Sequence, residues 1–236
     1  MNILEINGLT KSYPDFKLGP LELALPAGCI MGLVGENGAG KSTTIRLILQ
    51  MIRKESGTVS VFGKETAEEM RELKEEIGVV LDEVGLPECL TVEQVERVMR
   101  HTYRRWDSAE FDRLIQRLGL PRRKAFKEFS RGMKMKLGIA VALSHHSRLL
   151  ILDEATSGLD PVVRDEVLEL FREFAAEGER AVLISSHIVS DLEKICTHIA
   201  FLHKGTLLLC EEKEALLGRG MPIEELFLSM VGRRDV

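Results

Sequence analysis

The chain has 236 residues, 44% of them apolar and 29% charged, which is enough to bury a sizeable core and still predict a soluble protein. Its 32 basic and 37 acidic residues give a net charge of −5, which argues against a general electrostatic footprint for nucleic acid, so no nucleic-acid partner is expected. The apolar runs are far shorter than the roughly 20 residues that cross a bilayer, and the N-terminus lacks a secretion pattern, so we expect a cytoplasmic protein.

Short strands and helical stretches alternate at both ends of the chain. Within the first 63 residues, the predicted strands are ILEI, LELAL, CIMGLVG and TVSVFG, separated by glycine-containing turns. Towards the C-terminus, the predicted strands are LLILD, AVLISSH and HIAFLHKGTLLL. The last run is expected to form a hairpin that turns at Lys204 and Gly205. Strands of this kind, flanked by helices, predict an α/β sheet covered by helices.

The middle of the chain is predicted to be helical. Residues 91–146 contain little strand signal and three helical stretches, TVEQVERVMRHTYRRW, SAEFDRLIQRLG and SRGMKMKLGIAVALSHH. The first opens with the capping box Thr91-x-x-Gln94, and the second begins at Ser108. His145 and His146 follow the third stretch, where a role at the helix terminus is favoured.

The four cysteines give no sign of a metal site or of a disulfide framework. Cys29, Cys89, Cys196 and Cys210 are widely separated and form no C-x-x-C pair. We expect them to be reduced thiols, mostly buried.

A phosphate-binding loop is predicted from GENGAGKST at residues 35–43, which fits G-x-x-x-x-G-K-[ST] between an apolar strand and a helix pattern. The glycines let successive backbone N–H groups point at the β-phosphate, Lys41 reaches the β and γ oxygens, and the Ser42 hydroxyl ligates Mg²⁺. A glycine-rich turn that matches by chance is the alternative, and the flanking strand and helix disfavour it. The candidate nucleotide-binding residues of the loop are Gly35, Asn37, Gly38, Ala39, Gly40, Lys41, Ser42 and Thr43.

Two nearly identical stretches, VVLDEV at 79–84 and LILDEA at 150–155, could each supply the carboxylates of a nucleotide-hydrolysing site. The second continues into SGLDP, where Asp160 can cap a helix that begins with Pro161. Because this run has the layout of strand, turn and helix, we assign Mg²⁺ binding through water to Asp153 and polarisation of the attacking water to Glu154.

The order of four motifs carries a family resemblance. FSRGM at 129–133 stands about twenty residues before Asp153, and SSH at 185–187 about thirty after it. The phosphate loop, FSRGM, LILDEATSGLD and SSH, in that order and at those intervals, resemble the ATP-binding cassette family of transport ATPases, in its bacterial exporter-type form. The resemblance covers essentially the whole chain.

The resemblance implies a fold and a set of partners. The fold is α/β, a P-loop NTPase core with an N-terminal antiparallel β subdomain and an inserted α-helical subdomain. A single domain, 1–236, is expected, with 1–81 and 147–236 as nucleotide-binding core and 82–146 as the helical subdomain that carries the signature motif. The expected cofactors are ATP and Mg²⁺. The expected partners are a second ATPase domain, in a homodimer or heterodimer, and a separate transmembrane permease that holds the protein at the inner face of the membrane.

The resemblance also implies roles for individual residues. Ser130 and Gly132 of the signature motif would contact the γ-phosphate of the ATP bound by the partner subunit, and Ser130 would also cap the following helix. His187 corresponds to the histidine that contacts the γ-phosphate and helps to place Glu154. Tyr13 corresponds to the aromatic residue that stacks on adenine, with Phe16 as a possible substitute.

Two positions depart from the family pattern. Asp82 stands where the family has a glutamine that bridges Mg²⁺ and the water, and Arg131 replaces a glycine of the signature motif. An aspartate could bind the metal, but it would repel the γ-phosphate unless Mg²⁺ or a nearby base paired with it. The hypothesis is that hydrolysis survives through Glu154 and His187 while metal dependence or coupling is altered. The direction in which Arg131 points is left open.

The sequence is therefore interpreted as the ATP-binding and ATP-hydrolysing subunit of an ABC transporter, driven by ATP-dependent dimerisation. The alternative is an ABC ATPase without a transport role, regulatory or associated with nucleic acid or ribosomes.

Two basic clusters, HTYRRW at 101–106 and RRKAFK at 122–127, fall in the helical subdomain. Most of these charges are interpreted as a solvated surface, with Tyr103 and Trp106 as the candidates for docking a permease. The C-terminal tail, which ends in MPIEELFLSMVGRRDV, leaves room for a terminal helix.

Overall fold

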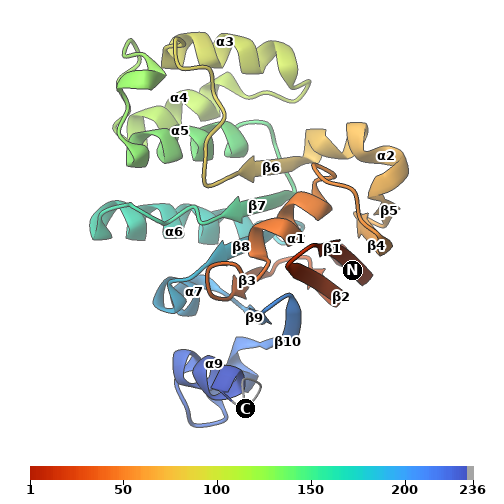
Figure 1. Cartoon of the computed structure of the whole chain (residues 1–236). Coiled ribbons are helices and arrows are strands. Elements are labelled where there is room, and N and C mark those ends of the chain that lie inside the picture. The colour runs from red at the N-terminus through yellow and green to blue at the C-terminus, as the bar shows by residue number, and fades with distance from the viewer. Residues whose placement is uncertain (233–236) are drawn as a thin grey trace.

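The computed structural model describes residues 1–232, apart from the side chains of residues 67–70, and in this part of the chain it contains two β-sheets (Figure 1). The order of strands in the larger sheet is β10 (Thr206–Glu212), β9 (His198–His203), β3 (Ile30–Val34), β8 (Ala181–Ser186), β7 (Leu149–Asp153) and β6 (Ile77–Val80). The order in the smaller sheet is β2 (Phe16–Pro26), β1 (Asn2–Tyr13), β4 (Ser56–Val61) and β5 (Lys64–Glu65). The predicted α/β class is confirmed.

The larger sheet is parallel from β6 to β9 and ends in the antiparallel hairpin of β9 and β10. The predicted turn at Lys204 and Gly205 is confirmed, and both residues have positive φ, 44° and 78°. Every residue of β3, β7 and β8 is buried. When both faces of a parallel sheet are covered, the side chains on both sides of each strand are buried. Such strands are therefore nearly continuous apolar runs in the sequence.

The smaller sheet is antiparallel throughout and holds the first strands of the chain. Its apolar side chains, such as Leu4 and Ile6, share one core with α1 (Lys41–Ile48) and with one face of the larger sheet, including Leu149 and Ile151. Leu150 and Leu152 point the other way, into the core shared with the helices after residue 91. The alternation follows from the period of two in a strand, and the predicted N-terminal antiparallel subdomain is confirmed.

The helices begin and end as follows: α2 Thr66–Leu73, the 3₁₀ turn η1 Lys74–Glu76, α3 Val92–Thr102, α4 Ser108–Arg117, the 3₁₀ turn η2 Phe126–Glu128, α5 Arg131–Leu143, α6 Pro161–Ala175, α7 Val189–Ile195, α8 Lys213–Leu217 and α9 Ile223–Gly232. The C-terminal tail holds α9. No helix in the described part of the chain is both long and apolar enough to cross a membrane.

The helices α3, α4 and α5 form a separate group beyond the β6 edge of the larger sheet (Figure 1). α5 packs against β6, while α3 and α4 pack against α5 and against each other. The Thr91 capping box is present. The backbone N–H of Gln94 donates to the Thr91 hydroxyl, and the backbone N–H of Thr91 donates to the side-chain oxygen of Gln94. α4 begins at Ser108 as predicted, with Asp107 as its cap. The exact boundaries at 82 and 146 stay a prediction.

Two expectations about side-chain positions need correction. Among the cysteines only Cys196 is buried, whereas Cys29 and Cys210 are half-buried and Cys89 is exposed, so the expectation of mostly buried thiols was wrong. His145 does not act at the terminus of α5. Its ring is buried beneath Tyr103, with 4.1 Å between the ring centroids.

The two aromatic docking candidates contribute to packing between α3, α4 and α5. Trp106 is half-buried and lies 5.2 Å from the buried ring of Phe111 on α4, centroid to centroid. Tyr103 is likewise half-buried, and burial raises the pKa of its phenol. Both rings stay partly exposed, and their role in docking a partner stays a prediction.

Candidate nucleotide-binding site

The predicted phosphate loop leaves β3 and enters α1, as its motif requires. Gly38 and Gly40 have φ of 82° and 110°, in the region that favours glycine. A Cβ atom on Gly40 would lie 2.7 Å from Leu18 Cδ1, and one on Gly35 would lie 2.4 Å from the Leu202 carbonyl oxygen. The loop therefore needs glycine at these positions to hold its shape. Because Gly40 is the N-cap of α1 and has no side chain, the positive end of this helix stays open to an anion.

A cavity of about 470 Å³ lies over this loop. Most of the predicted site residues line it, together with Phe16 and Glu36. The lining residues are Tyr13, Phe16, Glu36, Asn37, Gly38, Gly40, Lys41, Ser42, Thr43, Asp82 and Glu154. Gly35 and Ala39 belong to the loop without lining the cavity, and Ala39 is buried behind it. The fold thus brings the predicted phosphate-binding and carboxylate residues to one place.

Glu154 lies between two cationic or titratable partners. Its Oε1 is 3.3 Å from the Lys41 ammonium, and its Oε2 is 2.7 Å from His187 Nδ1. The residue follows the last residue of β7 and has a φ of 53°, a left-handed conformation that is uncommon for a non-glycine residue. Its backbone N–H donates to the hydroxyl and the carbonyl of Ser185 on β8, at 3.2 and 3.1 Å, which holds the turn.

Asp153 is buried at the end of β7, with 4% of its surface exposed. The Ser185 hydroxyl donates to Asp153 Oδ1 at 2.6 Å. Sequence reasoning missed Ser185, although it is the first residue of the SSH motif. The signal available was the pairing of β7 with β8, which places Asp153 directly opposite Ser185.

The residues present fit a nucleotide with Mg²⁺. Ser42 lines the cavity, and the buried Asp153 directly precedes Glu154, which also lines it. The Ser42 hydroxyl and the Asp153 carboxylate are both hard oxygen ligands of the kind that Mg²⁺ prefers. The described residues contain no group of three or more His, Cys, Asp or Glu side chains that could hold a metal by themselves. Mg²⁺ in phosphate-transfer proteins is usually held by one or two protein oxygens together with phosphates and water.

The signature segment lies at the start of α5. Ser130 is the N-cap, and its hydroxyl accepts from the Met133 amide at 3.2 Å, as predicted. A Cβ on Gly132 would lie 3.3 Å from Leu159, in the segment that leads to the Asp160 cap of α6. Ser130 and Gly132 are not among the residues that line the described phosphate-loop cavity.

The two departures from the family pattern meet each other. Arg131 Nη2 donates to Asp82 Oδ1 at 2.5 Å, so the base that the Asp82 hypothesis required is supplied by the signature segment. Asp82 still lines the phosphate-loop cavity.

Comparisons with known proteins agree on one family. The family model for ABC transporters matches residues 18–157, which is more than half of the chain. The chain belongs to the ABC transporter family. This ABC protein is 34% identical over 232 residues to a lantibiotic transport ATP-binding protein, SrtF, of Streptococcus pyogenes, with 97% of each chain covered. It is 36% identical over 209 residues to the bacitracin transport ATP-binding protein BcrA of Bacillus licheniformis, covering 87% of this chain and 68% of the relative.

Solved structures similar to this ABC protein are also ATP-binding proteins of ABC transporters or ATP-binding cassettes. The ATP-binding subunit of an ABC transporter superposes with a TM-score of 0.87 at 29% identity, covering 97% of this chain and 99% of the other. A dimeric ATP-binding cassette bound to ADP and Pi has a TM-score of 0.79 at 21% identity, with 89% and 98% covered, and shows a shared fold. The protein is thus the ATP-binding, ATP-hydrolysing subunit of an ABC transporter.

Proposed function

We propose that this ATPase hydrolyses Mg²⁺-bound ATP at a site that is completed by a second ATPase domain. The observation that carries the proposal is the separation of the two halves of the site within one chain. The phosphate loop, Lys41 and Glu154 share the described cavity, whereas Ser130 and Gly132 do not line it. A second copy, placed head to tail, would bring its Ser130 and the open N-terminus of its α5 to the γ-phosphate.

In this proposal each residue has a defined task. The loop glycines and Lys41 bind the phosphates, while Ser42 and Asp153 hold Mg²⁺, Asp153 through water. Glu154 polarises the attacking water, and His187, 2.7 Å from Glu154, orients the carboxylate. Tyr13, 43% exposed at the edge of the cavity, stacks on adenine.

Complementation between two inactive variants tests the shared site. Lys41→Ala removes the phosphate ligand, and Ser130→Asp places a carboxylate at the proposed partner γ-phosphate while keeping a good N-cap, so α5 should remain folded. Each variant alone should hydrolyse almost no ATP. Mixed dimers contain one site with both an intact Lys41 and an intact Ser130, so activity should reappear on mixing. Mixing that restores nothing, with both variants folded, would refute the shared site.

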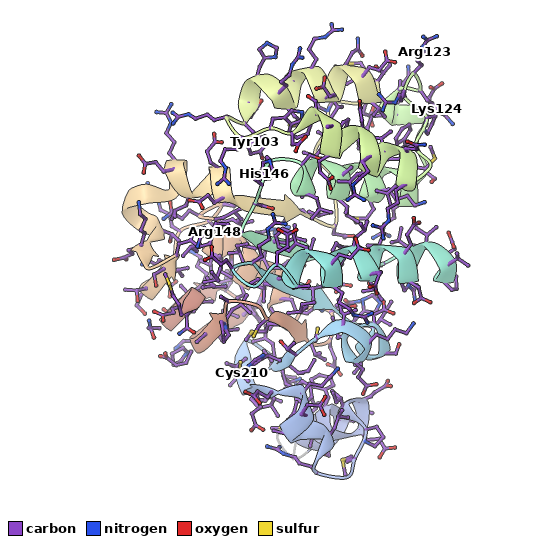
Figure 2. The ribbon with its side chains drawn as sticks, turned by 180° about the vertical axis from the view of Figure 1, so that it is seen from behind. Tyr103, Arg123, Lys124, His146, Arg148 and Cys210 are labelled. Atoms are coloured by element: carbon purple, nitrogen blue, oxygen red, sulfur yellow. The ribbon has the colours of Figure 1, made fainter. Side chains whose placement is uncertain are left out.

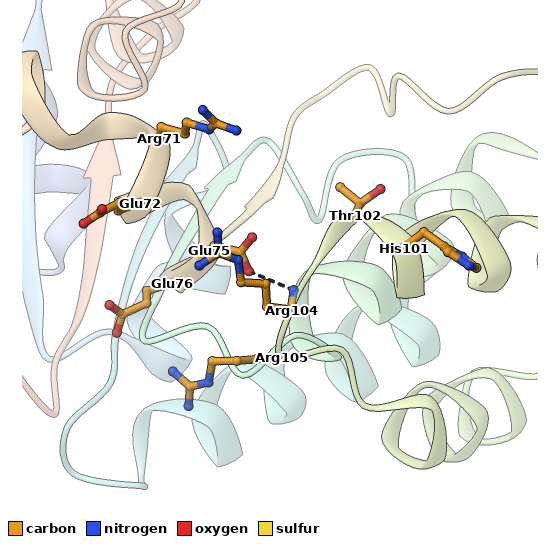
Figure 3. Close-up of a pocket in the computed structure, with 8 residues that line it drawn as sticks. All are labelled: Arg71, Glu72, Glu75, Glu76, His101, Thr102, Arg104 and Arg105. Atoms are coloured by element: carbon orange, nitrogen blue, oxygen red, sulfur yellow. Dashed lines mark hydrogen bonds between the residues drawn. The ribbon is translucent and has the colours of Figure 1, made fainter.

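We further propose that the permease docks where α2 and η1 face the end of α3. A cavity of about 900 Å³ opens there, with charges of both signs (Figure 3). Its lining residues are Arg71, Glu72, Glu75, Glu76, His101, Thr102, Arg104 and Arg105. The Arg104 amide donates to Glu75 across this cavity at 3.1 Å, which joins the two segments. The opening is large and polar enough to receive a short helical segment of a partner.

Co-purification with the membrane subunit tests this docking site. The double variant Arg104→Glu/Arg105→Glu reverses the charge of one wall and should abolish capture of a multi-span membrane protein. A matched control is Arg123→Glu/Lys124→Glu, which reverses two exposed charges at the outer end of the helical group (Figure 2). The control should still capture the permease. Equal loss in both variants would count against a localised site.

The proposed cargo class comes from the relatives. Two of them are named for the transport of bacitracin and of lantibiotics, both peptide antibiotics. We propose that this protein powers the export of a compound of that class. Cells that express it with its permease should tolerate a peptide antibiotic better than cells that express the Glu154→Gln form. If both kinds of cell are equally sensitive to every peptide antibiotic tested, the proposed cargo class is wrong. The role of the protein in a transporter is not affected by that result.

A further inference from the structure

The ion pair between Asp82 and Arg131 joins two segments that are far apart in the sequence. Asp82 lies just after β6, and Arg131 is the first residue of α5. The Arg131 side chain also passes over Gly158, because a Cβ on that glycine would lie 3.4 Å from Arg131 Cδ. The loop after β6, the start of α5 and the loop before α6 therefore meet around one guanidinium.

The position of Asp82 creates an electrostatic problem for a nucleotide site. Its carboxylate lines the same cavity as Lys41, Ser42 and Glu154. A triphosphate that enters this cavity brings several negative charges, and a second unpaired carboxylate beside Glu154 would repel them. Glu154 has Lys41 and His187 as partners, whereas Asp82 is paired with Arg131.

From this arrangement we propose that Arg131 is a charge-compensating positioning residue of the nucleotide site. It holds Asp82 and cancels its charge, so that the cavity accepts a triphosphate, and the two residues work as one unit. Neutral residues at positions 82 and 131 would also let the cavity accept a triphosphate. An aspartate at position 82 without the arginine at position 131 would not. The inference rests on the proposed nucleotide site and deepens it, because it assigns Arg131 a role in this chain's own cavity.

The pair is half exposed, with 57% of the Arg131 side chain and 51% of the Asp82 side chain accessible. Water and salt therefore screen it, and its effect should be modest and dependent on ionic strength. This property separates a charge effect from a structural one, because packing defects at the start of α5 would not respond to salt.

The experiment measures equilibrium binding of a fluorescent ATP analogue and of the matching ADP analogue, with Mg²⁺ and with EDTA. Arg131→Ala should weaken ATP binding about twofold to fivefold, the range typical of exposed ion pairs. The loss should be smaller for ADP, which carries less charge, and should vanish at high salt. Asp82→Asn should bind ATP at least as well as the unmodified protein. The double variant Asp82→Asn/Arg131→Ala should recover the original affinity.

A matched control removes a comparable pair outside the cavity. Arg113 on α4 makes a two-point contact with Glu110, both distances 2.7 Å, on an exposed surface. Arg113→Ala should leave nucleotide binding unchanged. If Arg131→Ala does not weaken ATP binding, or if the double variant stays as weak as Arg131→Ala, the inference is wrong. If the unmodified protein itself does not bind ATP, the proposed nucleotide site fails instead, and the two failures are thereby distinguished.

Discussion

Lys41 and Glu154 form an ion pair inside the nucleotide cavity, with 3.3 Å between Nζ and Oε1. Both side chains are largely buried, at 6% and 15% exposure. Lys41 also donates to the carbonyl oxygens of Gly35 and Glu36, at 2.7 and 3.3 Å. When Lys41 binds the phosphates of a nucleotide, its ion pair with Glu154 must therefore break. Phosphate binding by Lys41 is thereby coupled to the release of the Glu154 carboxylate.

The first prediction follows from that competition. Glu154→Gln should raise ATP affinity about tenfold, because a neutral amide neither holds Lys41 as strongly nor repels the phosphates. The same change should slow hydrolysis at least about a hundredfold, since the group that polarises the water is lost. Isothermal titration with ATP and a phosphate-release assay measure the two effects. The matched control is Glu169→Gln, an exposed carboxylate on α6. An unchanged hydrolysis rate in Glu154→Gln would exclude Glu154 as the base.

The second prediction concerns His187, whose Nδ1 lies 2.7 Å from Glu154 Oε2. His187→Ala should reduce the rate of ATP hydrolysis about a hundredfold or more, because the carboxylate and the water lose their orientation. The dissociation constant for ATP should change little. His187→Gln keeps a donor near Glu154 and should retain more activity than the alanine variant. Single-turnover kinetics measure the chemical step, and similar rates for the alanine variant and the unmodified protein would contradict the assignment.

The sequence was sufficient wherever a feature depends on neighbouring residues. The phosphate loop, the caps Thr91, Ser130 and Asp160, and the strand that ends at Asp153 are local patterns, and the structure contains each of them. The family motifs then carried the interpretation across the chain, since their order and spacing were read directly from the residues.

The features that escaped prediction depend on contacts between distant segments. Arg131 and Asp82 are 49 residues apart, and nothing in either local pattern indicates that they meet. Ser185 became a partner of Asp153 only through the pairing of β7 with β8. His145 was interpreted from its position after a helix, while its burial comes from Tyr103, which follows α3. Side-chain pairing of this kind needs the three-dimensional arrangement.

The third prediction separates two candidates for the adenine platform. Tyr13 and Phe16 both line the cavity, with 6.4 Å between their ring centroids. Tyr13→Ala should weaken ATP binding about fivefold to a hundredfold, the range expected from stacking of one base on an aromatic ring. Tyr13→Phe should keep the affinity, because stacking needs only a flat face. Phe16→Ala serves as the comparison. A larger loss in Phe16→Ala than in Tyr13→Ala would reassign the platform to Phe16.

The last prediction concerns pH and stability. Burial lowers the pKa of His145, a residue that is 1% exposed. Its Nδ1 lies 3.2 Å from the Glu75 carbonyl oxygen. Nε2 is buried without a hydrogen-bond partner among the described residues. A proton added to the folded state would therefore place an unsatisfied charged N–H in the junction beneath Tyr103.

The direction of the pH effect follows from linkage. The folded pKa of His145 lies below the unfolded value of about 6.5, so the unfolded chain binds the extra proton first. The free energy of unfolding should be unaffected by this group above that pH and should fall as the pH drops below it. Urea unfolding at pH 7.5 and 5.5 measures the difference. In His145→Gln the difference should be smaller, whereas His101→Gln, an exposed change on α3, should keep it. An identical difference in all three proteins would show that His145 does not control acid stability.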